Sequence, residues 1–274
     1  MNENLKKLKF RTCLKVNGLE NIPNDAPIIF CANHNCLMDI FYLPCALPDN
    51  TVNLISARLL YKNEIPKRKK MVNELLNAMP IEAHGGNTYA NMCISYATKL
   101  LCKGFNLCIF PEGAYIEPNN FVFKGRTGAS RILYGAASIL KSKPYLIPVA
   151  IKIESKKLDL DGYNPNDDIV TVSILKPIDY VLNFNSYVEE KDFNEKNRLI
   201  HLPIDKCMMA IANELKKEYK NEYIILRAKG NVVFEDASTV DVNIANESRF
   251  ILAYDTHLNN RLNNILSLFG LKSG

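Results

Sequence analysis

The chain is organised around the stretch PIIFCANHNCLMD, residues 27–39. Its four-residue apolar run is β-branched at the start and bounded by a proline and a polar turn, which predicts a buried strand. His34 follows this strand, and Asp39 opens an apolar pattern typical of a helix that runs to about Leu47. His34 therefore lies at a strand-to-helix junction, the place where α/β sheets carry their chemistry.

His34 and Asp39, with four residues between them, form a candidate base-and-orienter pair. The aspartate can hold one ring proton, so that the other ring nitrogen accepts a proton from a hydroxyl. The plainer alternative is a histidine bonded to a backbone carbonyl beside an aspartate on a solvated helix face, and the pair alone does not exclude it. Cys36, inside the same stretch, could act as a nucleophile or simply pack at the start of the helix.

The composition is that of a globular protein. Its 274 residues, 47% hydrophobic and 23% charged, suffice for one large α/β domain or two small ones. The net charge of +5 permits an anionic partner, such as a phospholipid surface or an acidic carrier protein, but is far from that of a nucleic-acid-binding protein. The eight cysteines lack a C-x-x-C pair, which favours buried thiols in a reducing compartment over disulfides or zinc ligands.

Neither a signal peptide nor a membrane span is predicted. The basic start of the chain leads into no apolar segment, and no run approaches the roughly 18 apolar residues that a span needs. The four histidines lie far apart and show no metal-ligand spacing, so we expect no metal site. These features predict a cytoplasmic protein whose contact with membranes is peripheral.

Periodicity predicts alternating strands and helices along most of the chain. We expect strands over residues 8–16, 28–31, 51–60, 79–82, 106–110, 146–153 and 169–175. We expect helices over residues 39–47, 62–79, 89–101, 124–140 and 203–220, with a loop at 84–89. This order predicts an α/β fold with a mixed, largely parallel sheet sandwiched by helices.

The last part of the chain is predicted to form an extension separate from the main domain. We expect a main domain over residues 1–220 and a C-terminal extension over 221–274. The extension begins with strand-like pieces and ends in an amphipathic helix over residues 246–271, with an apolar stripe at spacings of three and four. This stripe docks either on the protein's own core or on a bilayer.

A second chemical motif, FPEG, occupies residues 110–113 at the end of a predicted strand. The proline ends the strand, the carboxylate of Glu112 projects at its mouth, and Gly113 lets a substrate approach the backbone. Alone, this tetrapeptide is a weak signal. Its combination with His34 and Asp39 is a strong one.

With these two motifs the sequence resembles the glycerolipid acyltransferase family, which includes lysophosphatidate and glycerol-phosphate acyltransferases. The resemblance covers roughly residues 10–180. It rests on Asn33 and His34 with Asp39, on FPEG, on Phe123, Lys124 and Gly125 with Gly128 and Ala129, and on LIPV at 146–149.

The resemblance implies a role for each residue of the two motifs. His34 is the general base, which deprotonates an acceptor hydroxyl as it attacks the thioester of acyl-CoA or acyl-carrier protein, and Asp39 orients the imidazole. Glu112 and Gly113 help to bind the acceptor, beside Asn33. The acyl group moves in one step, so the reaction needs no covalent acyl-enzyme and no cofactor besides the thioester co-substrate.

The sequence departs from the family at two positions that concern the acceptor. Relatives with a phosphorylated acceptor usually carry an arginine after the strand at 79–82 and a second one after the glutamate–glycine pair. Here the pairs Ala83–His84 and Ala114–Tyr115 follow. Two guanidinium forks that would clamp a phosphate are therefore missing. Three cations could replace them in part: Lys124, Arg126 and His84.

We expect a peripheral-membrane O-acyltransferase that acts on a lysophospholipid acceptor such as 1-acylglycerol-3-phosphate. One alternative is a non-phosphorylated acceptor, such as an aminolipid, a glycolipid or a secondary metabolite. Another is a catalytically silent module that binds lipid or carrier protein. The basic cluster at 67–70, exposed loops or the helix at 246–271 would hold the protein at the membrane surface.

Overall fold

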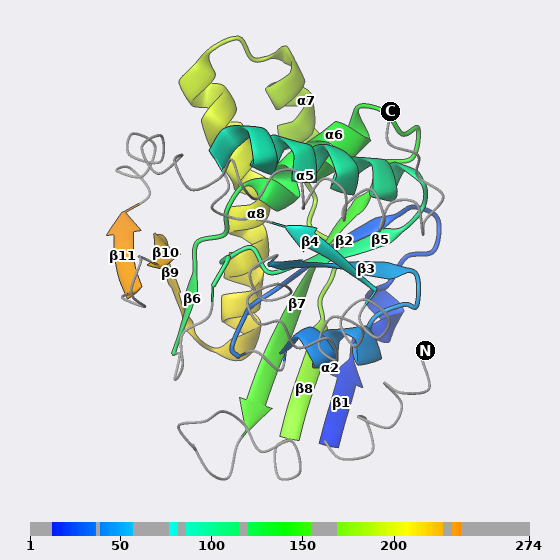
Figure 1. The fold of residues 1–274 in the computed structure, drawn as a ribbon, viewed down its shortest axis with the longest axis vertical. Coiled ribbons are helices and arrows are strands. Elements are labelled where there is room, and N and C mark those ends of the chain that lie inside the picture. Colours follow the sequence, from blue (N-terminus) through cyan, green and yellow to red (C-terminus); the bar gives the residue numbers. More distant parts are fainter. Residues whose placement is uncertain are drawn as a thin grey trace, which may run out of the picture.

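The computed structural model describes residues 13–36, 39–56, 77–81, 86–114, 120–154, 169–226 and 232–236. Within them, the strands of the main sheet are β1 (Cys13–Asn17), β2 (Ile28–Ala32), β3 (Thr51–Ser56), β4 (Ala78–Ile81), β5 (Asn106–Ile109), β7 (Tyr145–Glu154) and β8 (Ile169–Ile174). Their order across the sheet is β1-β8-β7-β2-β5-β3-β4 (Figure 1). Neighbouring strands are parallel except β7 and β8, so the predicted mixed, largely parallel sheet is confirmed.

Helices cover both faces of this sheet. The described helices are α2 (Asp39–Ala46), α5 (Gly86–Cys102), α6 (Gly128–Ala137), α7 (Val181–Glu189) and α8 (Phe193–Leu215), with a short 3-10 turn at Leu19–Asn21. In the described part of the chain, four further strands lie outside the main sheet: β6 (Phe121–Phe123), β9 (Glu218–Lys220), β10 (Glu222–Leu226) and β11 (Val232–Asp236). β6 pairs with β9 in parallel, and β10 pairs with β11 in antiparallel, at one side of the molecule (Figure 1).

The central strand β2 is buried on both faces, which explains its continuous apolar sequence. Because side chains alternate along a strand, Ile29 and Cys31 pack in the core formed with α5, α6 and α8. Ile28 and Phe30 pack in the opposite core, which contains the side chains of α2. The predicted sandwich of a sheet between helices is therefore confirmed.

The sheet topology brings the two chemical motifs together. β2 and β5 are parallel neighbours, with Cys31 opposite Ile109. Because the carboxyl ends of parallel neighbours meet at one edge of the sheet, His34 and Glu112 lie side by side although 78 positions separate His34 from Glu112. The fold thus builds one site from two distant pieces of sequence.

Two predicted helices have wrong boundaries because tertiary contacts override the local pattern. The helix expected over 124–140 begins at Gly128, after β6 and a turn in which Arg126 N donates to Pro111 O at 2.8 Å. The helix expected over 203–220 is α8, which begins after Asp192, whose side chain caps Glu195 N at 2.8 Å. It continues through Pro203 to Leu215 and is followed by the capping residue Lys216, which has a φ of 54°.

Other expectations are corrected locally or lie outside the described residues. α5 begins at Gly86, within the loop expected at 84–89, and the end of the helix expected over 62–79 belongs to strand β4. α7 was not predicted. The basic cluster at 67–70 and the helix at 246–271 lie outside the described residues, and the boundary between 220 and 221 stays a prediction.

Candidate active site

The predicted pair of His34 and Asp39 is formed at the carboxyl end of β2. His34 Nδ1 lies 2.9 Å from Asp39 Oδ2, and the same oxygen accepts the backbone N–H groups of Asn35 at 2.6 Å and Cys36 at 2.9 Å. The Asp39 side chain is fully buried, whereas 13% of the His34 side chain is exposed. The carboxylate therefore lies behind the imidazole at the first turn of α2, and the imidazole reaches the surface.

This geometry selects one tautomer of the imidazole. Asp39 Oδ2 already accepts two backbone N–H groups, so it is an acceptor toward the imidazole as well, and His34 Nδ1 carries the hydrogen of this hydrogen bond. Nε2 is then the nitrogen that can accept a proton. The alternative of an aspartate on a solvated helix face is wrong, because Asp39 is buried.

Glu112 connects the end of β2 to strand β6. Its Oε2 accepts the backbone N–H of His34 at 2.8 Å, and its Oε1 accepts the backbone N–H of Phe123 at 2.9 Å. The residue is only 1% exposed. Both carboxylate oxygens thus hold the backbone around the imidazole, and the predicted contact of Glu112 with an acceptor stays a prediction.

Burial perturbs the acidity of Glu112. Its pKa is raised to about 7, chiefly by burial, although the bonds from Phe123 and His34 and the ammonium group of Lys217 oppose the rise. The pKa of Lys217 is lowered by burial, against the influence of Glu112 and Asp39. Sequence reasoning missed Lys217, which follows the end of α8 and carries no motif that could have marked it.

The raised pKa of Glu112 predicts a pH-dependent stability. The folded state holds the proton up to about pH 7, whereas the unfolded state releases it near pH 4.5, so the free energy of unfolding falls as pH rises between these values. At about 1.4 kcal/mol per pKa unit, the loss attributable to this group is about 3 kcal/mol. Glu112→Gln should remove this component, as measured by urea unfolding of both proteins at pH 5 and pH 8.

The comparison of the two pH values is its own control, because every other titrating group is present in both proteins. The variant will also differ in stability at pH 5, since its amide cannot accept both backbone N–H groups. Only the change between pH 5 and pH 8 bears on the pKa. An equal change in the two proteins would show that Glu112 titrates normally.

Phe110 stacks on the imidazole. The ring centroids of Phe110 and His34 lie 4.1 Å apart, with an angle of 19° between the planes. The sequence marked Phe110 only as the first residue of FPEG, with no indication of this contact. Its one available signal was its place at the end of a strand that the sheet order sets beside β2.

The side chain of Asn33 bonds the end of β2 to the backbone of β7. Its Oδ1 accepts the N–H of Ile151 at 2.8 Å, and its Nδ2 donates to the carbonyl of Ile151 at 3.1 Å. The side-chain amide thereby continues the pairing of β2 with β7, and Asn35 Nδ2 donates to the same carbonyl at 2.9 Å. These contacts fix the turn that carries His34, and the substrate contact expected of Asn33 stays a prediction.

Gly113 lies exposed at the turn after β5, with a φ of 76° that favours glycine. A Cβ atom here would lie 3.0 Å from Arg126 Nε. The Arg126 guanidinium donates from Nη2 to the carbonyl of Ile224 at 3.0 Å and lies over the ring of Tyr223, 5.7 Å from its centroid. Burial lowers the pKa of Arg126. Arg126 therefore joins the glutamate–glycine turn to β10.

Lys124 is directed toward α8. Its Nζ lies 3.0 Å from both carboxylate oxygens of Asp205 and 3.0 Å from Asn221 Oδ1. Its contacts are therefore with α8 and the start of β10, and its predicted role in binding an acceptor stays a prediction. His84 lies outside the described residues.

Cys36 is 2% exposed, and its Sγ lies 3.8 Å from Asp39 Oδ1. A buried thiol that faces a carboxylate is poorly placed to attack an acyl group, which favours the packing role. In the part of the chain that the structure describes, no group of three or more His, Cys, Asp or Glu residues is placed to hold a metal ion. In the same part, no helix is both long and apolar enough to cross a bilayer.

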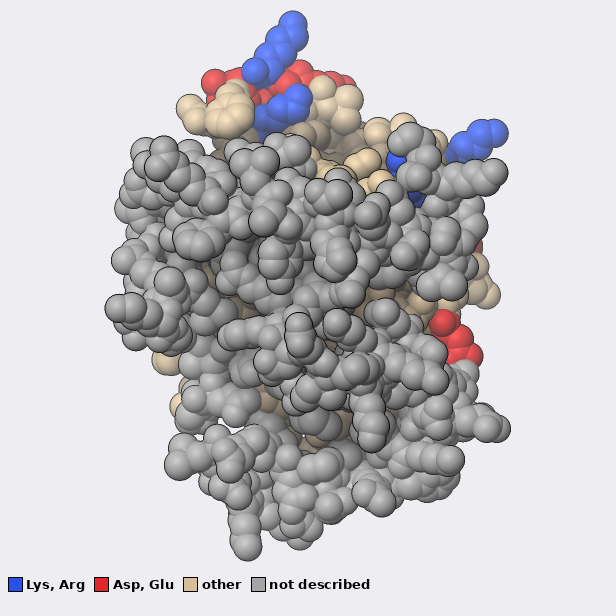
Figure 2. Space-filling model, viewed as in Figure 1, with Lys and Arg blue, Asp and Glu red and all other residues tan. Residues whose placement is uncertain are grey.

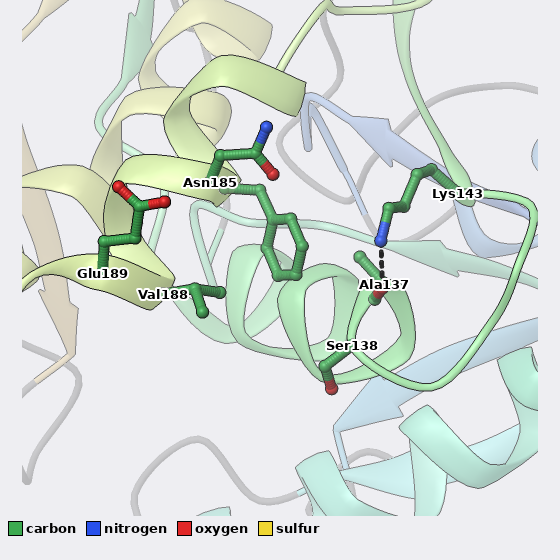
Figure 3. Close-up of a pocket in the computed structure, with 7 residues that line it drawn as sticks. Ala137, Ser138, Lys143, Asn185, Val188 and Glu189 are labelled. Atoms are coloured by element: carbon green, nitrogen blue, oxygen red, sulfur yellow. Dashed lines mark hydrogen bonds between the residues drawn. The ribbon is translucent and has the colours of Figure 1, made fainter.

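A hollow of about 370 Å³ lies away from this site. Its lining residues are Ala137, Ser138, Lys143, Phe184, Asn185, Val188 and Glu189 (Figure 3). Lys143 precedes β7, whose first residue pairs with Ile28 at the amino end of β2, opposite to His34. Acidic and basic side chains gather together at the end of the molecule where α7 lies (Figure 2). Because Lys143 lies at the amino end of these central strands, the hollow lies at the end of the sheet opposite to His34.

The α/β fold and the His34–Asp39 site agree with a comparison against protein families. The model of the acyltransferase family matches residues 13–152, just over half of the 274-residue chain, and includes both motifs. The protein belongs to the acyltransferase family.

Solved structures and curated sequences add little to this assignment. The chain is similar to the 1-acyl-sn-glycerophosphate (LPA) acyltransferase PlsC from Thermotoga maritima, with 20% sequence identity and a TM-score of 0.47. The similarity covers 76% of this chain and 79% of PlsC. No curated protein matches the chain by sequence.

Proposed function

We propose that this acyltransferase moves a fatty acyl group from the thioester of acyl-CoA or acyl-carrier protein to a hydroxyl group of a lysophospholipid. 1-Acylglycerol-3-phosphate is the first candidate acceptor. One observation carries the proposal. The imidazole of His34 reaches the surface, and its Nδ1 lies 2.9 Å from the buried carboxylate of Asp39. This is the arrangement that a general base for a hydroxyl group needs.

With the hydrogen on Nδ1, Nε2 of His34 is the atom that can act as the base. Nε2 of His34 takes the proton of the acceptor hydroxyl while its oxygen attacks the thioester carbonyl carbon. The tetrahedral intermediate then collapses, the carbon–sulfur bond breaks, and the thiolate receives the proton from the imidazolium. An ester and a free thiol result. Asp39 supports the positive charge that the imidazole carries between the two proton transfers.

We place the enzyme at the cytoplasmic face of a membrane, because its proposed acceptor resides there. The basic cluster at 67–70 and the amphipathic helix at 246–271 are the proposed contacts with the bilayer. Both rest on the sequence pattern.

A non-phosphorylated acceptor, such as an aminolipid or a glycolipid, is the second candidate. The two described cations that could replace the missing arginines have other partners: Lys124 bonds to Asp205 and Asn221, and Arg126 bonds to the carbonyl of Ile224. A phosphate clamp would have to compete with these contacts. This observation supports the second candidate, because a non-phosphorylated head group needs no phosphate clamp.

The deciding experiment measures thiol release from acyl-CoA with the full-length protein and a panel of acceptors. The panel contains 1-acylglycerol-3-phosphate, other lysophospholipids, a lyso-aminolipid and a glycolipid, and the acylated product is identified by mass spectrometry. We expect thiol release to depend on the acceptor and to be strongest with a lysophospholipid.

Each other result has a definite meaning. A preference for the aminolipid or glycolipid would select the second candidate. Thiol release with none of the acceptors, from acyl-CoA or from acyl-carrier protein, would contradict the proposed activity and support a silent binding module. Transfer that persists at full rate in His34→Ala would contradict the assignment of the base.

A further inference from the structure

We propose that Phe110 is a positioning residue for the catalytic imidazole, fixing the plane of His34 and stabilising the positive charge that this ring gains during transfer. The inference rests on the proposed function of His34 as general base. It concerns a residue outside the His34–Asp39 pair and outside the groups that bind substrate.

The stacking geometry suits this role. The two ring centroids lie 4.1 Å apart and the planes deviate by only 19°, so the imidazole faces the π-surface of Phe110. A phenyl ring is electron-rich on its face, and a cation within about 6 Å of the centroid is attracted to it. The neutral imidazole gains little from this attraction, whereas the imidazolium gains more. Because the imidazolium forms only as the hydroxyl loses its proton, the interaction favours the transition state over the ground state.

Hydrogen bonds of the turn after β5 place Phe110 beside His34. Gly113 N donates to the carbonyl of Phe110 at 3.1 Å, which closes the turn between the aromatic ring and the glycine. Two residues after Phe110, Glu112 accepts the backbone N–H of His34 at 2.8 Å. A single turn therefore contacts both the ring face and the backbone of His34.

Three contacts thus hold His34 in place. Asp39 fixes Nδ1, Glu112 fixes the backbone N–H, and Phe110 fixes the plane of the ring. Among the described residues, the ionisable groups near the site include Asp39, Glu112, the ammonium group of Lys217 and the guanidinium of Arg126 beside the turn at Gly113. Phe110 adds stabilisation of the imidazolium without placing another charge beside the buried Asp39.

The test changes the electron density of the ring while keeping its shape. We replace Phe110 by 4-fluoro-, 3,5-difluoro- and pentafluorophenylalanine, and separately by tyrosine and leucine. We expect kcat to fall stepwise with fluorination, to about one-tenth with pentafluorophenylalanine, while KM for the thioester stays unchanged. Phe110→Tyr, which keeps an electron-rich ring, should retain most activity, and Phe110→Leu should lose at least about 10-fold.

Phe184 supplies the matched control. It is a buried phenylalanine that lines the hollow at the opposite end of the sheet, where Lys143 Nζ lies 4.7 Å from its ring centroid. The same fluorinated residues at position 184 should leave kcat unchanged. If kcat does not depend on fluorination at position 110, the charge-stabilising role is wrong.

A second readout tests the stack without turnover. Nuclear magnetic resonance of the unliganded protein detects the ring protons of His34, identified by their loss in His34→Gln. The ring current of Phe110 should displace these resonances upfield, and Phe110→Leu should abolish the displacement. Unchanged resonances in Phe110→Leu would overturn the stack.

The two readouts separate this inference from the proposed function. A wild-type enzyme that transfers no acyl group overturns the proposed function and, with it, the charge-stabilising role of Phe110. The resonance comparison decides the stack independently of that result. Active enzyme with an intact stack and no response to fluorination overturns the charge-stabilising role of Phe110 and leaves the proposed function intact; an unchanged kcat in Phe110→Leu would overturn its orienting role as well.

Discussion

Replacing His34 by alanine is expected to lower kcat for acyl transfer by about 10²–10⁴-fold, because the acceptor hydroxyl loses its general base. The fold should survive. The His34 side chain is partly exposed, and the buried Asp39 carboxylate keeps the backbone N–H groups of Asn35 and Cys36 when the imidazole is removed. Steady-state kinetics with acyl-CoA and the best acceptor of the panel measure the loss, and urea unfolding measures stability.

Two comparisons sharpen this prediction. Imidazole added to the solution should restore part of the activity of His34→Ala, because it can occupy the space between Asp39 and Phe110. Arg198→Ala is a control at the start of α8, where an exposed ion pair with Glu195 contributes little to stability and should not affect kcat. A purified His34→Ala protein with near-normal turnover would refute the mechanism.

Replacing Asp39 by asparagine is expected to lower kcat by about 10²-fold while the site keeps its geometry. Three donors converge on Asp39 Oδ2: His34 Nδ1 and the backbone N–H groups of Asn35 and Cys36. An asparagine satisfies them only with its carbonyl oxygen in that place, since its NH₂ group would face three donors. The tautomer of His34 is then preserved, and the main loss is the negative charge that supports the imidazolium, beside the weak contact of Cys36 Sγ with Asp39 Oδ1.

Asp39→Ala separates geometry from charge. It removes the acceptor altogether and leaves two buried backbone N–H groups without their partner, at a cost of about 1–3 kcal/mol each in the free energy of unfolding. We therefore expect Asp39→Ala to be clearly less stable than Asp39→Asn by urea unfolding. Asp39→Asn with wild-type kcat would show that the carboxylate charge has no part in catalysis.

The structure also explains why some predictions of secondary structure succeeded and others failed. β2 was predictable because a strand buried on both faces must be apolar throughout, and α2 because its apolar pattern begins at a polar turn and ends before Pro48. The expected helix start at residue 203, where a proline is a common first helical residue, was wrong, because α8 begins at Phe193. The cap by Asp192 and the burial of Pro203 against the core outweighed that local signal.

The candidate site divides in the same way. His34 and Asp39 lie five positions apart, so a short stretch of chain brings them within 2.9 Å and their pairing could be inferred from spacing. Glu112 was recognised from its motif, but its partners were not. Its bond to His34 joins residues 78 positions apart, and its bond to Phe123 requires the turn that replaces the predicted start of a helix.

By itself, the sequence determined the α/β class, the buried central strand, the His34–Asp39 pair and the location of the FPEG turn, because each depends on contacts within a few residues or on burial of a continuous apolar run. Only the tertiary structure decided that Phe110 stacks on His34, that Glu112 holds two backbone N–H groups, and that Lys124 faces Asp205. These contacts depend on the order of strands in the sheet and on the packing of α8. Neither leaves a periodic trace in the residues concerned, because the partners are chosen by distance in space and not by spacing along the chain.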